Sequence, residues 1–229
     1  PDAPYLTLDS SRKTLTGTAG SLHIGRKSKG LWRYSAGFGW FSPGLELNDI
    51  GYMQQTDIIR LTGEVSYFVN KPVSVFRTYS LVFREGNHWD FGGRYLVSDL
   101  ELETRFEFLN KWVIEAHPGY QPQRLDTRLL WGGEAMAMPA TWRIYSHFNS
   151  DYSKNLLFAF DFQTERSDHQ AYLKYEISPA VNYRPFTTLS LSAGATYTRT
   201  SNELQYITTL NYQDHPRYIL GTIDWTTLS

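Results

Sequence analysis

Apolar and polar residues alternate with a period of two along most of the chain, and helical periodicity is almost absent. In the stretch DLELETRFEFL, residues 99–109, Leu and Phe occupy one parity and ionised Glu and Arg the other. Residues 32–40, 59–69, 156–163, 173–183 and 189–198 repeat the alternation. Because successive side chains of a strand point to opposite faces, each segment predicts a strand with one apolar and one polar face. We count roughly eleven such strands.

Most of these strands are about ten to thirteen residues long, which exceeds the usual five or six of a soluble sheet. The length fits the ~9–11 residues that a tilted strand needs to cross a bilayer. Short turns are predicted near residues 26–30, 70–74, 110–112, 150–155 and 184–188, and mostly longer segments separate them. Short turns at one end and long loops at the other are typical of an outer-membrane barrel.

The predicted fold class is therefore all-β, an antiparallel up-and-down transmembrane β-barrel of which this chain supplies roughly 11 strands. In such a barrel the apolar face contacts acyl chains and the polar face lines the interior. The alternative is a soluble sandwich in which the same polar face meets bulk water. A soluble carbohydrate-binding module would have that architecture.

A polar interior needs compensated charges, and opposite charges on neighbouring strands pair across a sheet. Arg60, Arg84 and Arg143 are candidate partners for the glutamates of residues 99–109, although the sequence does not give the strand register. The predicted lumen charge ladder consists of Arg60, Glu64, Glu101, Glu103, Arg105, Glu107, Arg143, Lys174 and Glu176.

Aromatic residues make up 16% of the chain, and several share the apolar parity near predicted strand ends. A membrane-interface girdle needs such amphipathic rings. The competing interpretation is sugar-stacking aromatics in a lectin-like sandwich. Two further tryptophans, Trp89 and Trp131, lie in predicted long loops and are candidates for ligand contact. The predicted girdle consists of Trp32, Trp40, Tyr67, Trp112, Tyr183 and Tyr197.

Composition narrows the function classes. The net charge of -1 gives no electrostatic case for a nucleic-acid partner. The absence of cysteine excludes disulfides, thiolate metal sites and thiol nucleophiles. The chain has no run of about 18 apolar residues and no signal-peptide pattern at its start. Mean hydropathy is -0.42, which a barrel with a polar interior and polar loops accommodates.

The stretch WRYSAGFGWFSPGLELNDIGYMQQTD, residues 32–57, resembles part of a known family. It is similar to the C-terminal barrel of Gram-negative outer-membrane proteins classed as domain of unknown function 5916. Residues 76–93 and 217–229 also look similar to later segments of that barrel. The loop motif consists of Ser42, Pro43, Gly44, Glu46, Asn48 and Asp49.

The resemblance implies an integral protein of the Gram-negative outer membrane, with the lipid bilayer and other envelope proteins as partners. In those proteins the barrel usually follows a periplasmic domain similar to carbohydrate-binding module family nine. The implied role is a pore, docking or anchoring component associated with carbohydrate handling or envelope complexes. No cofactor is implied.

The chain departs from the family in extent, since the carbohydrate-binding-like domain and a closing strand with a terminal aromatic residue are both missing. An odd number of strands is also unusual for a bacterial single-chain barrel. We therefore expect residues 1–229 to be a single β-barrel segment, incomplete at the C-terminus and also at the N-terminus.

The loop motif offers weak metal candidates. Glu46, Asn48 and Asp49 carry oxygen donors suited to Ca²⁺, but their spacing matches no EF-hand, and Asn-Asp is common in turns. A structural loop is the favoured interpretation, and no metal site is predicted. The resemblance implies that the loop folds against or into the lumen, where it would narrow a pore.

No catalytic residue is predicted. Glu101 and Glu103 are about 7 Å apart along a strand, which suits an inverting glycosidase, but any i, i+2 pair has that separation. His147 and Ser146 are adjacent, so they point to opposite faces of a strand and cannot act together. A barrel-embedded hydrolase remains the second alternative, tested by changing His147 or Glu103.

Overall fold

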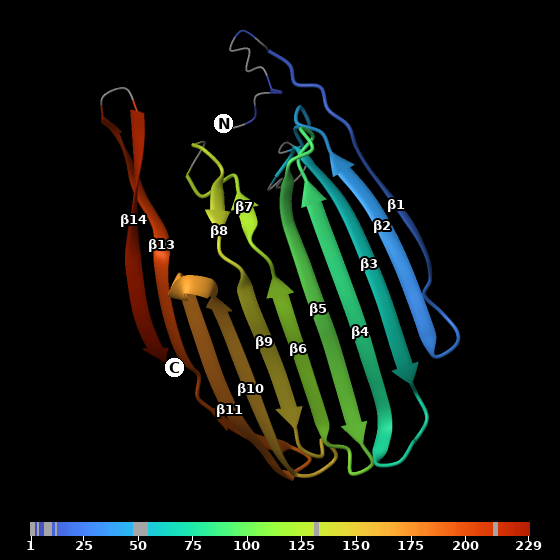
Figure 1. Cartoon of the computed structure of the whole chain (residues 1–229). Helices are drawn as coiled ribbons and strands as arrows, with labels where there is room; N and C mark the ends of the chain where they lie inside the picture. The colour runs from blue at the N-terminus through green and yellow to red at the C-terminus, as the bar shows by residue number, and fades with distance from the viewer. Residues whose placement is uncertain are drawn as a thin grey trace.

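The computed structural model describes residues 3, 5–6, 11, 13–47, 55–130, 133–212 and 215–229. Its described part is one 12-stranded antiparallel sheet with a separate two-stranded hairpin (Figure 1). The prediction of an all-β antiparallel fold is confirmed. The sheet is open, however, because its first and last strands, β1 and β14, do not pair with each other.

Strands adjacent in sequence are adjacent in the sheet, which is the arrangement of a meander. The first half consists of β1 (Ala19–Arg26), β2 (Trp32–Phe41), β3 (Ile58–Val69), β4 (Phe76–Trp89), β5 (Tyr95–Phe108) and β6 (Val113–Gln121). The second half consists of β9 (Thr141–Asn149), β10 (Leu156–Ser167), β11 (Tyr172–Phe186), β12 (Leu189–Gly194), β13 (Tyr197–Tyr212) and β14 (His215–Leu228).

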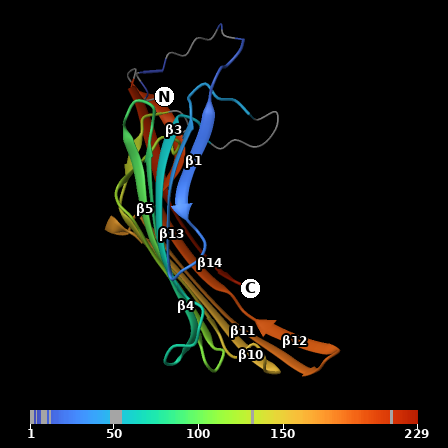
Figure 2. The same cartoon turned by 90° about the vertical axis from the view of Figure 1, so that its right-hand side faces the viewer.

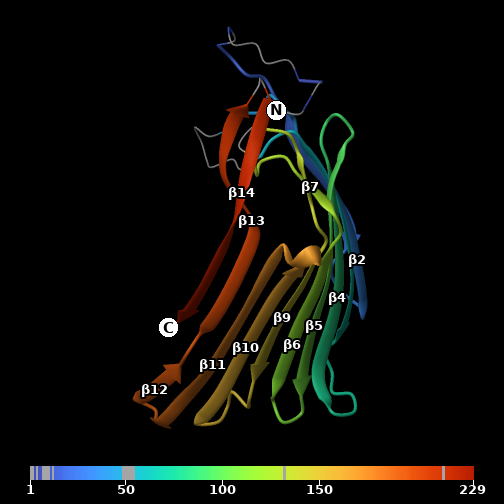
Figure 3. The ribbon, with the colours of Figure 1, turned by 60° about the vertical axis from the view of Figure 1, so that its left-hand side comes forward.

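Strands β12 and β13 together form one neighbour of β11. β12 pairs with the half of β11 that includes Tyr183, and β13 pairs with the half that includes Tyr172. Between β6 and β9 the chain forms the small hairpin of β7 (Arg124–Asp126) and β8 (Met136–Met138), which sequence alternation did not predict. Figures 2 and 3 show that the large sheet is twisted and curved rather than flat.

The two ends of the sheet differ. The connections β1–β2, β3–β4, β5–β6, β9–β10 and β11–β12 are short and lie together at the lower end in Figure 1. The connections β2–β3 and β6–β9, which include the β7–β8 hairpin, lie at the opposite end and are longer. We call these the short-turn end and the long-loop end. The predicted short turns all fall at the short-turn end.

The sheet has no apolar core of ordinary size. In the described part of the chain, the buried apolar residues are Ile58, Val69, Val82, Leu96, Val113, Leu130 and Ala171. Large apolar side chains instead stand exposed on one face, including Leu102 at 38%, Phe158 at 49% and Leu191 at 53%. No second layer of the described chain covers them, because the sheet is a single layer (Figure 2). We call this side the apolar face and the other the polar face.

The only helical element that the described residues form is a 3-10 turn, Asp168–Gln170, between β10 and β11. Within the same residues no helix combines the length and the apolar character needed to cross a membrane.

Candidate functional site on the polar face of the sheet

One row of directly opposed residues crosses the polar face from strand to strand. Residues opposed in an antiparallel pair point to the same side, so the register alone places them together. From β3 to β13 the row reads Glu64, Arg84, Glu101, Gly119, Arg143, Glu165, Lys174 and Thr200. We call it the charge row. Opposite charges are neighbours in it, which favours cross-strand pairing.

Arg84 is the centre of the largest group of contacts. Its Nε lies 3.1 Å from Oε2 of Glu64, and its Nη1 lies 2.6 Å from Oε2 of Glu103 and 3.7 Å from Oε1 of Glu101. One guanidinium on β4 therefore ties together carboxylates from both neighbouring strands. Their side chains are about one-third exposed, so water screens each pair only in part.

Gly119 makes room for an ion pair formed by Arg143, the next basic residue of the charge row. Arg143 on β9 reaches across β6 and forms an ion pair with Asp99 on β5. A Cβ at Gly119 would lie 3.5 Å from Nε of Arg143, so the guanidinium lies directly over the glycine. A larger side chain at position 119 would have to share that space with Arg143.

Next to the charge row, β5, β6, β9 and β10 carry a second polar group. Arg105 forms an ion pair with Glu115. His147 lies with Nδ1 2.6 Å from Oδ1 of Asp161 and Nε2 2.6 Å from Nδ2 of Asn149. Both ring nitrogens are therefore engaged, and Asn149 donates to Nε2 while His147 donates from Nδ1 to the carboxylate. In this arrangement the lone pair of Nε2 already accepts a hydrogen bond from Asn149.

The remaining ladder residues lie on the same face with different partners. Lys174 lies 3.4 Å from Glu176, and Glu107 lies 2.8 Å from Arg77. Among the described residues Arg60 forms no ion pair with the β5 glutamates; Arg84, on the strand between them, contacts Glu101 and Glu103. The guanidinium of Arg60 lies 5.5 Å from the ring centroid of Phe41 instead.

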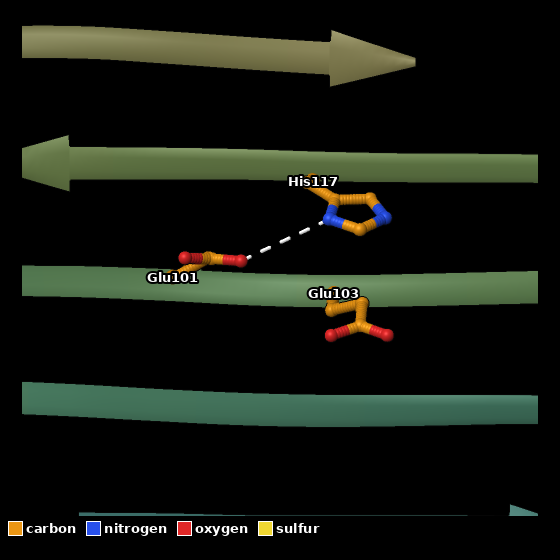
Figure 4. A group of neighbouring side chains, drawn as sticks. All are labelled: Glu101, Glu103 and His117. Atoms are coloured by element: carbon orange, nitrogen blue, oxygen red, sulfur yellow. Dashed lines mark ion pairs between the residues drawn. The ribbon is translucent and has the colours of Figure 1, made fainter. Parts of the chain in front are cut away.

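Glu101, Glu103 and His117 form a cluster that the sequence reasoning missed (Figure 4). One potential ligand atom from each lies within 4.8 Å of the others, and Nδ1 of His117 is 3.8 Å from Glu101. Arg84 already supplies the positive charge for both carboxylates, so the cluster is chemically an ion-pair centre. The short β5–β6 turn could have revealed this cluster. A tight turn there sets Glu107 opposite Val113, and the same register places His117 on β6 beside Glu103 on β5.

Two belts of aromatic rings bound the apolar face. At the short-turn end, ring contacts link Trp32 to Tyr67 at 4.9 Å and Tyr67 to Tyr79 at 6.1 Å. Tyr79 contacts Phe106, and further along Trp112 contacts Phe148. This is the lower belt. Trp32, Tyr67 and Trp112 of the predicted girdle lie in it, and Tyr183 lies near the same end, opposite Leu156.

The upper belt lies toward the long-loop end. It comprises Trp40, the pair Trp89 and Tyr95 at 5.5 Å, and the pair Tyr120 and Trp142 at 4.3 Å. Trp32 and Trp40 are separated by eight residues of one strand, roughly 26 Å at a rise of ~3.3 Å per residue. The sequence predicts Trp89 in a loop, whereas in the structure it is the last residue of β4. Trp131 lies outside the described residues.

Tyr197 lies outside both belts. It begins β13 opposite Ile177 and contacts Tyr175, in the middle of the sheet. The separation of faces also weakens at β13 and β14, where Trp225 is opposed to Thr200 and so shares the polar face. On β4, Glu85 lies on the apolar face because it is opposed to Leu100. The clean separation of faces is thus a property of β1 to β11 with local exceptions.

The loop motif packs against the segment before β1. The Ser42 amide donates to the Thr18 carbonyl at 2.9 Å, and the Thr18 amide donates to Ser42 Oγ at 2.7 Å. A Cβ at Gly44 would lie 2.3 Å from the Thr16 carbonyl oxygen, so only glycine permits this approach. The described part of the loop, including Pro43 and Glu46, therefore lies at the long-loop end beside residues 16–18. Asn48 and Asp49 lie outside the described residues.

Further polar contacts gather at the long-loop end, around a cavity of about 290 Å³ whose lining includes Asp57, Asp90 and Arg94. Asp90 is only 2% exposed and accepts from the Arg94 amide and guanidinium. Tyr5 donates to Asp57 at 2.5 Å, and partial burial together with that carboxylate raises the pKa of Tyr5 above its ordinary value. The Phe91 amide also donates to Asp57 at 3.0 Å, so Asp57 links Tyr5 to the β4–β5 connection.

Asp126 organises the β7–β8 hairpin. Its carboxylate accepts from Nη1 of Arg124 at 3.0 Å and from the amides of Arg128 and Leu129 at 2.9 Å each. Burial alone would raise the pKa of Asp126, but the hydrogen bonds outweigh it and hold the pKa below its ordinary value.

Replacing Arg84 tests the ion-pair centre. Arg84→Gln leaves Glu64, Glu101 and Glu103 without their shared cation, so we expect the free energy of unfolding to fall by about 1 kcal/mol. Urea titration in detergent micelles measures it. Arg60→Gln removes the same charge from the neighbouring strand without breaking a carboxylate pair. Equal losses in the two variants would contradict the central role of Arg84.

Asp126 predicts a pH dependence of the hairpin. Since its pKa is lowered on folding, its stabilisation is present above its unfolded-state pKa of about 3.9 and is lost as pH falls further, through its folded-state pKa. Intrinsic amide exchange slows as pH falls toward ~3, so the readout is protection, the ratio of the intrinsic to the measured exchange rate. For the amides of Arg128 and Leu129, followed by mass spectrometry after acid pulses, this protection should drop below pH ~4. In Asp126→Asn the exchange should be faster at neutral pH and should not show this drop in protection. A drop that persists in the variant would refute the assignment.

The comparisons with known proteins leave the function open and settle the family. No curated protein and no solved structure matched the chain. A family model described as Domain of unknown function (DUF5916) matches residues 4–229. The match spans nearly the whole sequence, including every strand of the sheet. The chain therefore belongs to the DUF5916 family.

Proposed function

We propose that this chain forms part of the wall of a β-barrel in the outer membrane of a Gram-negative envelope, as a pore, docking or anchoring component. The observation that carries the proposal is the exposed apolar face between two aromatic belts. A transmembrane barrel presents an apolar band about 25 Å tall between aromatic girdles. At a barrel-strand tilt of about 35–45°, the roughly 26 Å of strand between Trp32 and Trp40 projects to about 20 Å of height, somewhat less than that band.

The polar face supports the same proposal. A lumen wall needs charges that compensate one another, and the contacts of Arg84, Arg105 and Arg143 supply this within the sheet. A sheet that lies in lipid must also pair its edges, because unpaired backbone groups are costly there. The edges β1 and β14 are unpaired, so the proposal includes further strands that close the wall.

The proposal includes no chemical step. His147 is held by hydrogen bonds at both ring nitrogens, and Ser146 is opposed to Ala116 and Phe162 on the apolar face. Among the described residues, neither this group nor the Arg84 centre aligns a nucleophile with a free base. A role in carbohydrate handling rests on the domain that usually accompanies the barrel in this family, and the polar face itself favours no particular solute.

One pair of substitutions separates a lipid-facing sheet from a water-facing one. Phe83 lies between the belts, is 43% exposed and is opposed to Val65 and Leu102 on the apolar face. In lipid, Phe83→Arg should cost about 2–4 kcal/mol and lower the fraction of chain that floats with phosphatidylcholine vesicles. In water, the same change at a half-exposed site is worth about 0.5 kcal/mol or less.

The control is Thr62→Arg on the polar face, opposed to Gly37 and Gly86. It adds the same charge to the adjacent strand and should leave flotation unchanged. Equal flotation of both variants, or a chain that stays in the aqueous phase, would refute the barrel and favour a soluble carbohydrate-binding module.

A further inference from the structure

Basic side chains concentrate at the short-turn end. The five short connections carry five bases, the lysines at 27, 29, 71, 111 and 154, and a single acid, Asp151. The flanking strand residues add the bases Arg26, Arg77 and Arg184, together with the acids Glu107 and Glu115. The five connections at the long-loop end carry, in the sequence, eight acids and three bases. The eight bases are Arg26, Lys27, Lys29, Lys71, Arg77, Lys111, Lys154 and Arg184. We call them the basic turn set.

Most of this charge is not used within the chain. Arg77 pairs with Glu107, and Lys111 donates to Ser153 on the adjacent turn. Within the described structure, the other six form no ion pair with a carboxylate, and all six are exposed. These six exposed cations along one end of the open sheet are available to an anionic partner outside the chain.

The position of the set indicates which partner. It lies at the end of the sheet that carries the lower belt, and Arg26 is opposed to Tyr34 on the apolar face. Trp32 begins the next strand only a few residues away, with its ring on Tyr67. Aromatic rings followed by Lys and Arg are the order in which a protein meets the acyl boundary and then the headgroups of a leaflet.

We propose that the basic turn set docks on anionic phospholipid headgroups, so that the short-turn end lies in a leaflet rich in lipids such as phosphatidylglycerol. This inference rests on the proposed function, because it assumes that the apolar face is in lipid. Charge complementarity and the adjoining belt together favour a headgroup layer over free phosphate, which would not need the belt.

Flotation of the full chain tests the proposal. Vesicles of phosphatidylcholine alone are compared with vesicles that also contain about 30% phosphatidylglycerol, at low and high salt. We expect phosphatidylglycerol to increase the bound fraction at low salt, and high salt to reduce the gain. Each base near an anionic surface is worth about fivefold in affinity, so Lys27→Gln with Lys29→Gln should reduce the gain at least fivefold.

The matched control removes two bases from the long-loop end, Lys13→Gln with Arg128→Gln, and should retain the full gain. No gain from phosphatidylglycerol, or an equal loss in both double variants, would overturn the proposal. The proposal would also be overturned if inorganic phosphate released the chain from the vesicles more than chloride does at equal ionic strength. The basic turn set would then be a site for free phosphate.

Quenching of tryptophan fluorescence by brominated acyl chains distinguishes failure of the headgroup proposal from failure of the proposed membrane barrel. Quenching in pure phosphatidylcholine without any phosphatidylglycerol gain would retain the membrane barrel and remove the headgroup site. Absence of quenching in both vesicles would remove the membrane barrel itself.

Discussion

A single-layer sheet has to find cover for its apolar face, and this constraint governs the rest of the structure. In a sandwich the inner faces of two sheets cover each other. Here the described chain supplies one sheet, and side chains such as Phe83, Leu102 and Phe158 remain about two-fifths to one-half exposed. A water-soluble monomer rarely leaves an apolar patch of more than a few hundred Å² uncovered, and this one spans β1 to β11. Whatever covers the apolar face is therefore not part of the described residues.

The polar face obeys the complementary constraint. Charges on a half-buried surface are tolerated when each has a partner, and removal of one partner leaves the other uncompensated. The register supplies partners by placing Arg84 between Glu64 and Glu101, and by placing Gly119 where Arg143 must reach across a strand. A one-residue slip of any strand would turn these charges onto the apolar face, so the ion pairs and the apolar face specify the same register.

Period-two alternation predicted the strands and the short turns, because a strand with two different faces records its orientation in its own sequence. Register depends on pairs of strands, so alternation did not identify Arg84 as the centre or exclude Arg60. The β7–β8 hairpin was missed because three-residue strands are too short for a period to appear. The sequence places Tyr197 in the girdle because it lies near the end of the predicted strand 189–198, whereas in the structure β12 ends at Gly194 and β13 begins at Tyr197.

The two edge strands, β1 and β14, determine which neighbouring strands could close the sheet in a membrane. Within the part of the chain that the structure describes, no strand pairs with the outer side of β1, Ala19–Arg26, or with the outer side of β14. In water such edges are tolerated because solvent satisfies them, but in hydrocarbon each unpaired group costs several kcal/mol. The face separation is clean beside β1 and weak beside β14, where Trp225 shares a side with Lys174 and Thr200. A strand that pairs with β14 therefore has to cover an aromatic side chain on the polar side, whereas one that pairs with β1 meets small and polar residues such as Ser21 and His23 there. In the proposed barrel, closure thus requires two different neighbours, which argues against a symmetric contact between two copies of the same edge.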